Sequence, residues 1–331
     1  MECIVTNLFD EIKQTITDKQ VRIVLPEGTD ERVLQAAVKL HNEGIVTPIL
    51  VGSYDLVKVA AKQAGIDLTD IEVIDPVQFE QLDNLIDQYV ERRNGKSSPE
   101  QARIQLKDVN TFGTMLVYTG YAHGLVSGAA HTTADTVRPA LQIIKTKPGV
   151  SKTSGAFIMV RGDERYVFAD CAITIAPTSE DLAEIAVESA KTAKAFGIEP
   201  KVAMLSFSTK GSAVSPETLK IVEATKLAQE KAPSVNIDGE FQFDAAFVPA
   251  VAKKKAPGSS IQGDANVFVF PSLEAGNIGY KLAERLGGFE AIGPILQGLN
   301  MPVNDLSRGC SADDVYKLVL MTAAQSVMAG E

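Results

Sequence analysis

Residues 22–40, RIVLPEGTDERVLQAAVKL, contain the pattern that decides the fold. The run 22–26 is short, apolar and closed by a proline, which is typical of a buried strand. A loop with a capping residue follows at 27–30. Apolar side chains then recur with the spacing of one helix face, at Val33, Ala36, Ala37 and Leu40. The stretch therefore predicts one strand–loop–helix module of an α/β protein.

The same alternation continues along the first half of the chain. Strand patterns at 45–52 and 71–74 surround a helical pattern at 57–65, and residues 79–107 are charged and helical in character. Repeated strand–helix modules form a mostly parallel sheet that helices cover. We therefore expect this half to be an α/β domain.

A different pattern begins after Thr146-Lys147-Pro148-Gly149. Strand patterns at 154–160 and 165–173 flank Gly162-Asp163, which predicts an antiparallel hairpin. Helix and strand patterns then alternate again. They predict helices at 179–196 and 215–231, and strands at 201–207, near 236–243 and at 266–270.

A second group of chain-breaking residues follows at 297–302, so we expect domain boundaries near 148 and 298. Domain I would comprise residues 1–147 and 299–331, closed by a C-terminal helix. Domain II would be an inserted α/β domain, residues 148–298. Two α/β domains of this kind predict a central cleft, which is a common place for a ligand.

Composition argues against several classes of function. The 331 residues carry a net charge of −10 and no tryptophan, which disfavours nucleic-acid partners. No apolar run is long enough to cross a membrane, and the first residues lack the pattern of a signal peptide. The three cysteines (Cys3, Cys171 and Cys310) form no metal motif, and an odd number suits a reducing compartment. We expect a soluble cytoplasmic protein without membrane or metal.

Several familiar catalytic motifs are absent from the sequence. There is no phosphate-binding GxxxxGK[ST], no strand–GxGxxG–helix, and no GxSxG. His41, His123 and His131 are the only histidines. A nucleophilic pair of Ser127 with a neighbouring histidine is a minor alternative.

Residues 127–139, SGAAHTTADTVRP, suit an anion. The small residues allow a ligand close to the backbone, and Ser127, Thr132, Thr133 and the backbone N–H groups offer donors at a helix start. Arg138 adds a guanidinium that can bind a phosphate in a bidentate manner. The alternative is an ordinary helix start with threonine caps and a surface arginine.

Residues 270–281, FPSLEAGNIGYK, end a buried strand and begin a helix. Ligands bind at this edge of a parallel sheet, so Gly276 and Asn277 are candidates for substrate binding. A helix cap with packing glycines explains the pattern equally well.

The stretch 304–314, NDLSRGCSADD, places Ser307 and Arg308 just before a helical pattern at 311–328. It follows 293–302, GPILQGLNMP, which we expect to be a loop. Ser311 and the acidic residues could simply start the helix. The alternative is that Ser307, Arg308 and Asp314 form a site for an anion.

Taken together, these segments resemble a phosphate acetyltransferase of the compact bacterial type. The resemblance is carried by six stretches across nearly the whole chain: SGAAHTTADTVRPALQIIKT, FADCAI, LSFSTKGSA, DGEFQFDAA, VFVFPSLEAGNIGYK and GPILQGLNMPVNDLSRGCSADD. It implies reversible transfer of an acetyl group between acetyl phosphate and coenzyme A, with phosphate as the other product. It also implies a fold like that of isocitrate and isopropylmalate dehydrogenases, a homodimer formed through domain II, and no cofactor, since coenzyme A is a substrate.

The resemblance also implies site residues. Ser307, Arg308 and Asp314 would be catalytic, and Arg138 would bind substrate. A further arginine corresponds to Arg93, although the neighbouring Arg92 also fits. The expected reaction is direct attack of the coenzyme A thiolate, with Asp314 as general base.

Four alternatives stay open at this point. The enzyme could prefer a longer acyl group such as butyryl. Cys310 could be a covalent nucleophile. The same fold could hold a metal-dependent hydroxy-acid dehydrogenase, or a binding module without turnover.

Overall fold

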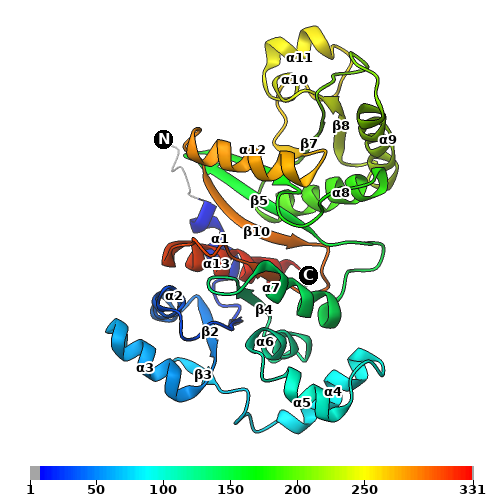
Figure 1. Ribbon diagram of the computed structural model, residues 1–331. Coiled ribbons are helices and arrows are strands. Elements are labelled where there is room, and N and C mark those ends of the chain that lie inside the picture. Colours follow the sequence, from blue (N-terminus) through cyan, green and yellow to red (C-terminus); the bar gives the residue numbers. More distant parts are fainter. Residues whose placement is uncertain (1–7, 330–331) are drawn as a thin grey trace. The chain divides into compact units, whose positions relative to one another are not determined.

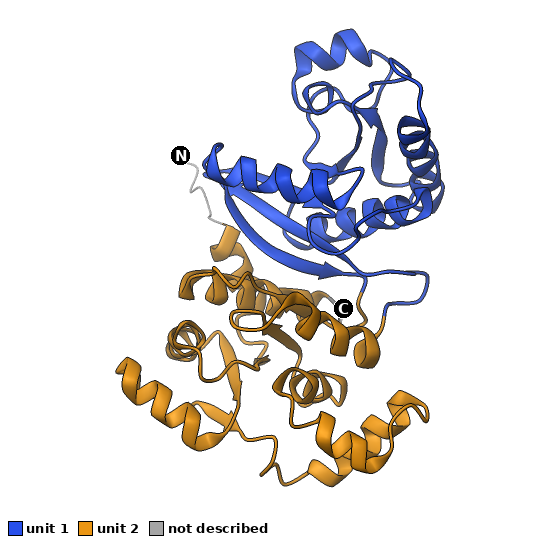
Figure 2. Cartoon of the chain, viewed as in Figure 1, with its two compact units in different colours: residues 1–5, 146–298 blue, residues 6–145, 299–331 orange. Residues whose placement is uncertain are grey.

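The computed structural model describes residues 8–329, so Cys3 and the rest of the first seven residues lie outside it. The chain divides into two compact units, shown in Figure 2. Among the described residues, unit 1 takes 146–298, and unit 2 takes 8–145 together with 299–329. The junctions therefore fall at 145/146 and 298/299, where the sequence predicts 147/148 and 298/299.

Unit 2 contains a five-stranded sheet in the order β11-β4-β1-β2-β3, and all its strand pairs are parallel (Figure 1). Its strands are β1 (Val21–Leu25), β2 (Val46–Val51), β3 (Glu72–Ile74), β4 (Gly124–Ser127) and β11 (Val303–Asp305). The strand β11 follows unit 1 in the sequence and pairs with β4. The sheet of unit 2 is thus completed by the end of the chain.

Helices join and cover this sheet. They are α1 (Leu8–Ile16), α2 (Glu31–Glu43), α3 (Tyr54–Ala64), α4 (Leu82–Arg93), α5 (Pro99–Gln105), α6 (Val109–Tyr118), α7 (Thr133–Pro139), the π-helix η1 (Ala140–Ile144) and α13 (Ala312–Ala329). Helix α13 packs on α1, α2, β1 and β4. The C-terminal helix therefore closes unit 2.

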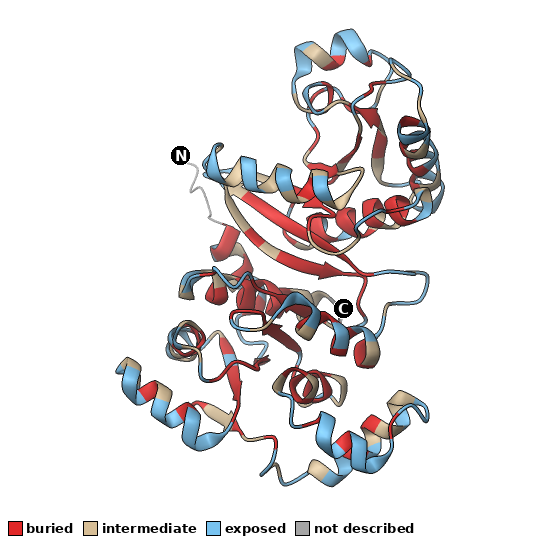
Figure 3. Ribbon diagram, in the orientation of Figure 1, coloured by how far each residue is buried: buried red, intermediate tan, exposed pale blue. Residues whose placement is uncertain are grey.

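The first strand–loop–helix module forms as predicted. The Asp30 carboxylate accepts a hydrogen bond from the Arg32 amide and caps α2. Helix α2 buries the predicted apolar stripe and ends at Gly44 in the left-handed conformation. Figure 3 shows buried residues concentrated on the strands and on one side of such helices.

Unit 1 contains a six-stranded mixed sheet in the order β10-β5-β6-β9-β7-β8. Its strands are β5 (Ser154–Arg161), β6 (Glu164–Ala169), β7 (Lys201–Leu205), β8 (Asn236–Phe241), β9 (Val267–Val269) and β10 (Glu290–Gln297). The β5–β6 hairpin turns at Gly162-Asp163, as predicted, and it is antiparallel. The helices of this unit are α8 (Ser179–Ala195), α9 (Pro216–Lys231), α10 (Phe243–Phe247), α11 (Pro249–Lys255) and α12 (Leu273–Arg285).

The expectation of a loop at 293–302 is wrong for its first half. Residues 293–297 belong to β10, which pairs antiparallel with β5. The register shifts between Ile292 and Ile295, so Gly293 and Pro294 lie in a bulge and pairing resumes beyond them. Glycine and proline here mark an irregular strand, because a bulge tolerates both residues.

Candidate active site

Three loops meet at the carboxyl edge of the sheet in unit 2. They follow β1, β4 and β11, which are neighbouring parallel strands. Asp305 at the end of β11 stands in register with Ser127 at the end of β4, and the Leu306 amide donates to the Ser127 carbonyl at 2.7 Å. This edge of a parallel sheet is where ligands bind.

Glu27, buried after β1, holds the loop after β4. Its carboxylate accepts hydrogen bonds from four consecutive backbone N–H groups, those of residues 128–131, at 2.7–3.1 Å. It also lies 2.8 Å from Nδ1 of His131. These four donors were expected to bind phosphate. That expectation is wrong for them, because the protein's own carboxylate already occupies the cradle.

Gly128 allows the loops after β4 and β11 to pack together. It has a φ of +109°, and a Cβ there would lie 2.4 Å from Oδ1 of Asp305. Any side chain would therefore separate the two loops.

Arg32 ties all three loops together, and sequence reasoning missed it. Its guanidinium is paired with Asp30 at 2.8 Å. It donates to the backbone carbonyls of Ala129 at 2.6 Å, Arg308 at 2.8 Å and Cys310 at 3.0 Å. The only local signal was an arginine two residues after a capping aspartate, and that signal does not reveal partners far away in the sequence.

Ser307 and Arg308 lie exposed at the surface of this edge. The Arg308 guanidinium makes no hydrogen bond or ion pair with any residue in the described range, so it is available to a ligand. Asp314 is half-buried, and its Oδ2 accepts hydrogen bonds from the Ser311 amide at 2.7 Å and hydroxyl at 2.8 Å. The Ser311 hydroxyl accepts in return from the Asp314 amide. The segment is thus a helix start that also presents a free arginine.

The predicted residues after β4 lie in different environments. Ser127 is fully buried. Thr132 and Thr133 are exposed, and the Thr132 hydroxyl donates to Asp135 at 2.7 Å in a cap of α7. Arg138 is exposed on the same helix. The capping alternative is therefore correct for Thr132, and Arg138 is free to contact a ligand.

The structure separates Arg92 from Arg93. Arg92 lies over the Tyr118 ring and donates to the carbonyls of Ile143 at 2.5 Å and Ile144 at 3.0 Å. Nε of Arg93 is buried and has no hydrogen-bond partner among the described residues. Arg92 thus stabilises the end of the π-helix, whereas Arg93 retains an unused donor.

Gly276 and Asn277 lie in unit 1, near the start of α12, apart from the other predicted residues in the sequence. A Cβ at Gly276 would lie 2.2 Å from the Asp170 carbonyl oxygen. Asn277 donates to the Cys171 carbonyl at 3.1 Å. Both residues therefore have structural contacts within unit 1, and their role in substrate binding stays a prediction.

Cys310 is a poor candidate for a nucleophile. It is buried, and burial raises the pKa of its thiol to about 11, although the Arg32 guanidinium lowers it in part. The guanidinium lies 3.7 Å from Sγ. The thiolate, which is the reactive form, is therefore scarce at neutral pH.

Asp305 is a buried carboxyl beneath the site. Burial raises the pKa of Asp305 to about 6, and the negative charge of Glu27 adds to the increase. The hydroxyls of Thr133 and Thr136 face it and moderate the increase. Oδ1 of Asp305 makes no hydrogen bond with a described residue.

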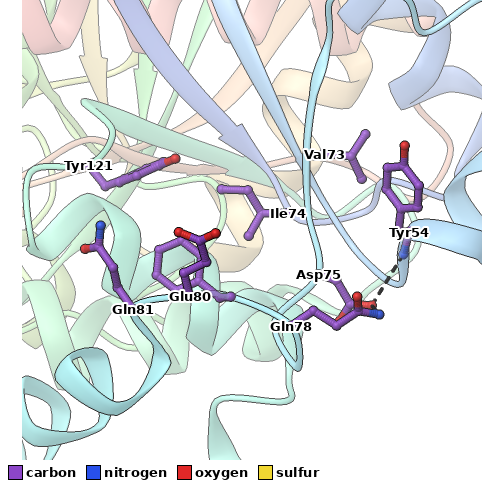
Figure 4. A pocket seen from close by; sticks show the side chains of 9 residues that line it. Tyr54, Val73, Ile74, Asp75, Gln78, Glu80, Gln81 and Tyr121 are labelled. Atoms are coloured by element: carbon purple, nitrogen blue, oxygen red, sulfur yellow. Dashed lines mark hydrogen bonds between the residues drawn. The ribbon is translucent and has the colours of Figure 1, made fainter.

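A cavity of about 460 Å³ lies elsewhere in unit 2, beside the edge strand β3 (Figure 4). Tyr54, Phe79 and Tyr121 contribute its aromatic lining, and Asp75 accepts a hydrogen bond from the Tyr54 amide at 3.4 Å. No predicted site residue lines this cavity.

Comparisons with known proteins agree with this geometry. A family profile described as "Phosphate acetyl/butaryl transferase" matches residues 7–323. A phosphate acetyltransferase of Bacillus subtilis is 65% identical over 321 residues, which cover 97% of this chain and 99% of that protein. The chain therefore belongs to this family of acyltransferases, as the sequence predicted.

Solved structures show the same fold. The EutD phosphotransacetylase from Staphylococcus aureus is 62% identical, with a TM-score of 0.92 over 96% of this chain and 98% of that one. A structure from Salmonella typhimurium described as a 4-hydroxythreonine-4-phosphate dehydrogenase aligns with a TM-score of 0.54 at 13% identity, covering 93% of this chain and 99% of that one. The expected α/β fold, similar to that of a dehydrogenase, is confirmed.

The raised pKa of Asp305 predicts a pH dependence of stability. The folded state binds a proton at a pKa of about 6 and the unfolded chain at about 3.9, so the free energy of unfolding falls as pH rises from 4 to 6. Asp305→Asn removes this loss, which amounts to about 3 kcal/mol. Urea unfolding at pH 4 and pH 8 should show that the free energy of unfolding of Asp305→Asn, relative to that of wild type, is higher at pH 8 than at pH 4. Equal pH dependence in both proteins would contradict the buried, ionisable Asp305.

Arg93→Ala should lower kcat/KM for acyl transfer by about 10- to 100-fold, because it removes a charged donor available to an anionic substrate. Arg92→Ala is the matched comparison. It should lower the melting temperature and leave kcat/KM of the folded enzyme within about threefold of wild type. If Arg92→Ala abolished turnover without loss of stability while Arg93→Ala stayed active, the assignment would be reversed.

Proposed function

We propose that this enzyme catalyses the reversible reaction of acetyl-CoA and phosphate to give coenzyme A and acetyl phosphate. The exposed and unpaired Arg308, beside Asp314 at the carboxyl edge of the sheet, carries the proposal. In a chain with a net charge of −10, a free guanidinium whose own backbone carbonyl is held by Arg32 is a specific place for an acyl phosphate. The named relatives support the acetyl group as the one transferred.

The proposed chemistry is a direct transfer. The coenzyme A thiolate attacks the acetyl carbonyl, a carbon–sulfur bond forms, and the carbon–oxygen bond to phosphate breaks with its electron pair leaving on phosphate. The thiol proton passes to Asp314 and then to the phosphate product. Because coenzyme A is a substrate, the reaction requires no resident cofactor.

The difficult step is removal of the thiol proton. An ordinary thiol and an ordinary aspartate differ in pKa by about 4.6, which corresponds to roughly 6 kcal/mol. Oδ2 of Asp314 is used by Ser311, and its Oδ1 makes no hydrogen bond with a described residue. Arg308 lowers the cost of this proton transfer, because its positive charge favours both the thiolate and the growing oxyanion. Ser307 is placed to orient the carbonyl or the sulfur.

The alternative covalent route through Cys310 has little support, because its thiol is buried and its pKa is raised. The structure offers no observation that favours a longer acyl group over acetyl.

We also propose a cytoplasmic location, in keeping with Cys171 and Cys310 being free thiols. No helix in the described part of the chain is long and apolar enough to span a bilayer.

We further propose that the enzyme is a homodimer formed through unit 1. Helix α12 and its C-cap present an apolar stripe at helical spacing, with Ile278, Leu282 and the C-cap Leu286 exposed by 58%, 52% and 83%. Three large apolar side chains in one exposed row are typical of an interface. A second copy of the chain fits best, because one stripe can face its own equivalent across a twofold axis.

Formation of acetyl-CoA from acetyl phosphate and coenzyme A tests the proposed reaction. Arg308→Ala should lower kcat/KM by about 10²- to 10³-fold, the usual loss for an oxyanion-stabilising group. Asp314→Asn should lower kcat by about 10²-fold or more, within the range for a general base. Cys310→Ala should stay within a few-fold of wild type, and so should the control Arg103→Ala, which removes an exposed arginine paired with Asp83.

Loss of turnover in folded Cys310→Ala would instead indicate an acetyl-cysteine intermediate. Turnover with butyryl phosphate and none with acetyl phosphate would retain the mechanism and overturn the substrate.

Sedimentation equilibrium tests the dimer. Wild type should sediment as a dimer at micromolar concentration, and Leu282→Lys should shift it to monomer, because a charge would be buried in the interface. Leu56→Lys is the matched control on α3, since Leu56 is similarly exposed (61%) and belongs to unit 2. A monomeric wild type, or an unchanged dimer in Leu282→Lys, would contradict the proposal.

A further inference from the structure

Asn110 lies beneath the candidate site, although no sequence motif marks it. A Cβ at Gly113, on α6, would lie 3.0 Å from Leu125 of β4 and 3.3 Å from Pro26 after β1. Asn110 is one helical turn earlier, on the same face of α6. Helix α6 ends near the start of the strands, where the His123 amide donates to the Arg22 carbonyl. Asn110 therefore points toward the opposite edge, where the substrate loops begin.

Ser127 faces the same space from the sheet. Side chains two residues apart on a strand share one face, so Ser127 is on the side that Leu125 presents to α6. Asp305 is its partner in register on β11 and points to the same side. Thr136 reaches Asp305 from α7, which packs on both α6 and β11. The packing of these four elements thus directs four polar side chains to the same side of the sheet.

All four side chains are buried and incompletely bonded. Each is at most 1% exposed. Both amide atoms of Asn110, the hydroxyls of Ser127 and Thr136, and Oδ1 of Asp305 lack a hydrogen-bond partner among the described residues. A buried polar atom left unpaired costs roughly 1–3 kcal/mol, so five such atoms on one side of the sheet, from elements that pack together, indicate a hydrogen-bonding occupant.

The chemistry of the lining limits what that occupant can be. It offers amide and hydroxyl donors together with amide and carboxyl acceptors. The Asp305 carboxylate repels phosphate, and the residues are too buried for a substrate. Water suits such a site, because it needs two to four polar partners of both kinds.

We propose that Asn110, Ser127, Thr136 and Asp305 form an internal water site, and that Asn110 is a positioning residue for acyl transfer. The site lies directly under Gly128 and Leu306, which start the two loops of the candidate active site. Water held by Asn110 fixes the ends of β4 and β11, and through them the positions of Ser307 and Arg308. The kinetic part of this inference rests on the proposed function.

Three variants test it. Asn110→Leu keeps the volume and removes both polar atoms, and Asn110→Ser restores a polar atom and leaves room for another water. Thr114→Val is the matched control, because Thr114 is equally buried on α6 but its hydroxyl is satisfied by the Asn110 carbonyl at 2.7 Å. We expect Asn110→Leu to lower kcat at least tenfold with little change in KM, Asn110→Ser to recover part of the loss, and Thr114→Val to stay near wild type.

The stability measurement separates positioning from simple folding. Asn110→Leu removes one partner of the water and leaves the other three buried polar side chains with fewer partners, at a cost of roughly 1–3 kcal/mol, so its melting temperature should fall, and kcat is compared well below that temperature, where the variant is folded. Wild-type kcat in Asn110→Leu would overturn the positioning role. Equal losses in Asn110→Leu and Asn110→Ser would show that the shape of the side chain matters and its polarity does not.

A crystal structure at high resolution tests the water site independently. Ordered water should lie within hydrogen-bonding distance of Asn110 and Asp305 in wild type, and it should be lost in Asn110→Leu. A dry, closed space in wild type would overturn the water site. Water present in an enzyme that transfers no acetyl group would confirm the water site, reject the proposed function and with it remove the positioning role.

Discussion

The carboxylate of Glu27 is the contact on which the candidate site depends. It satisfies four backbone N–H groups in a row, and without it the buried amides of Gly128 and Ala129 would have no partner. It also fills the cradle of amides that a phosphate would otherwise occupy. These four amides are therefore not available to an anionic substrate.

The cations around the edge of the sheet have different tasks. Arg32 is paired with Asp30 and directed at backbone carbonyls, so it serves as a brace between loops. Arg92 similarly supports a helix end. Arg308 and Arg138 are exposed and lack such partners among the described residues. Arg32 and Arg92 thus stabilise the loops and a helix end, and Arg308 and Arg138 remain available to ligands.

Sequence reasoning succeeded where structure is determined by neighbours in the chain. The Asp30 cap, the stripe of α2 and the hairpin at Gly162 are local features. It failed at β10, because the pairing of that strand with β5 outweighs the local signal of Gly293-Pro294. Arg32 and Asn110 were missed for the same reason. The carbonyl that Arg32 contacts on Arg308 is 276 residues away in the sequence, and no local pattern reports such a contact.

The insertion of unit 1 has a consequence for synthesis of the chain. Unit 1 is continuous from residue 146 to residue 298, so it can fold while the ribosome is still working. Unit 2 cannot do so, because β4 pairs with β11 and the sheet packs on α13, and both elements follow residue 298. Until then β4 keeps an open edge, which is a hazard for aggregation. The residues made after unit 1 are therefore those that complete both the core of unit 2 and its candidate catalytic segment.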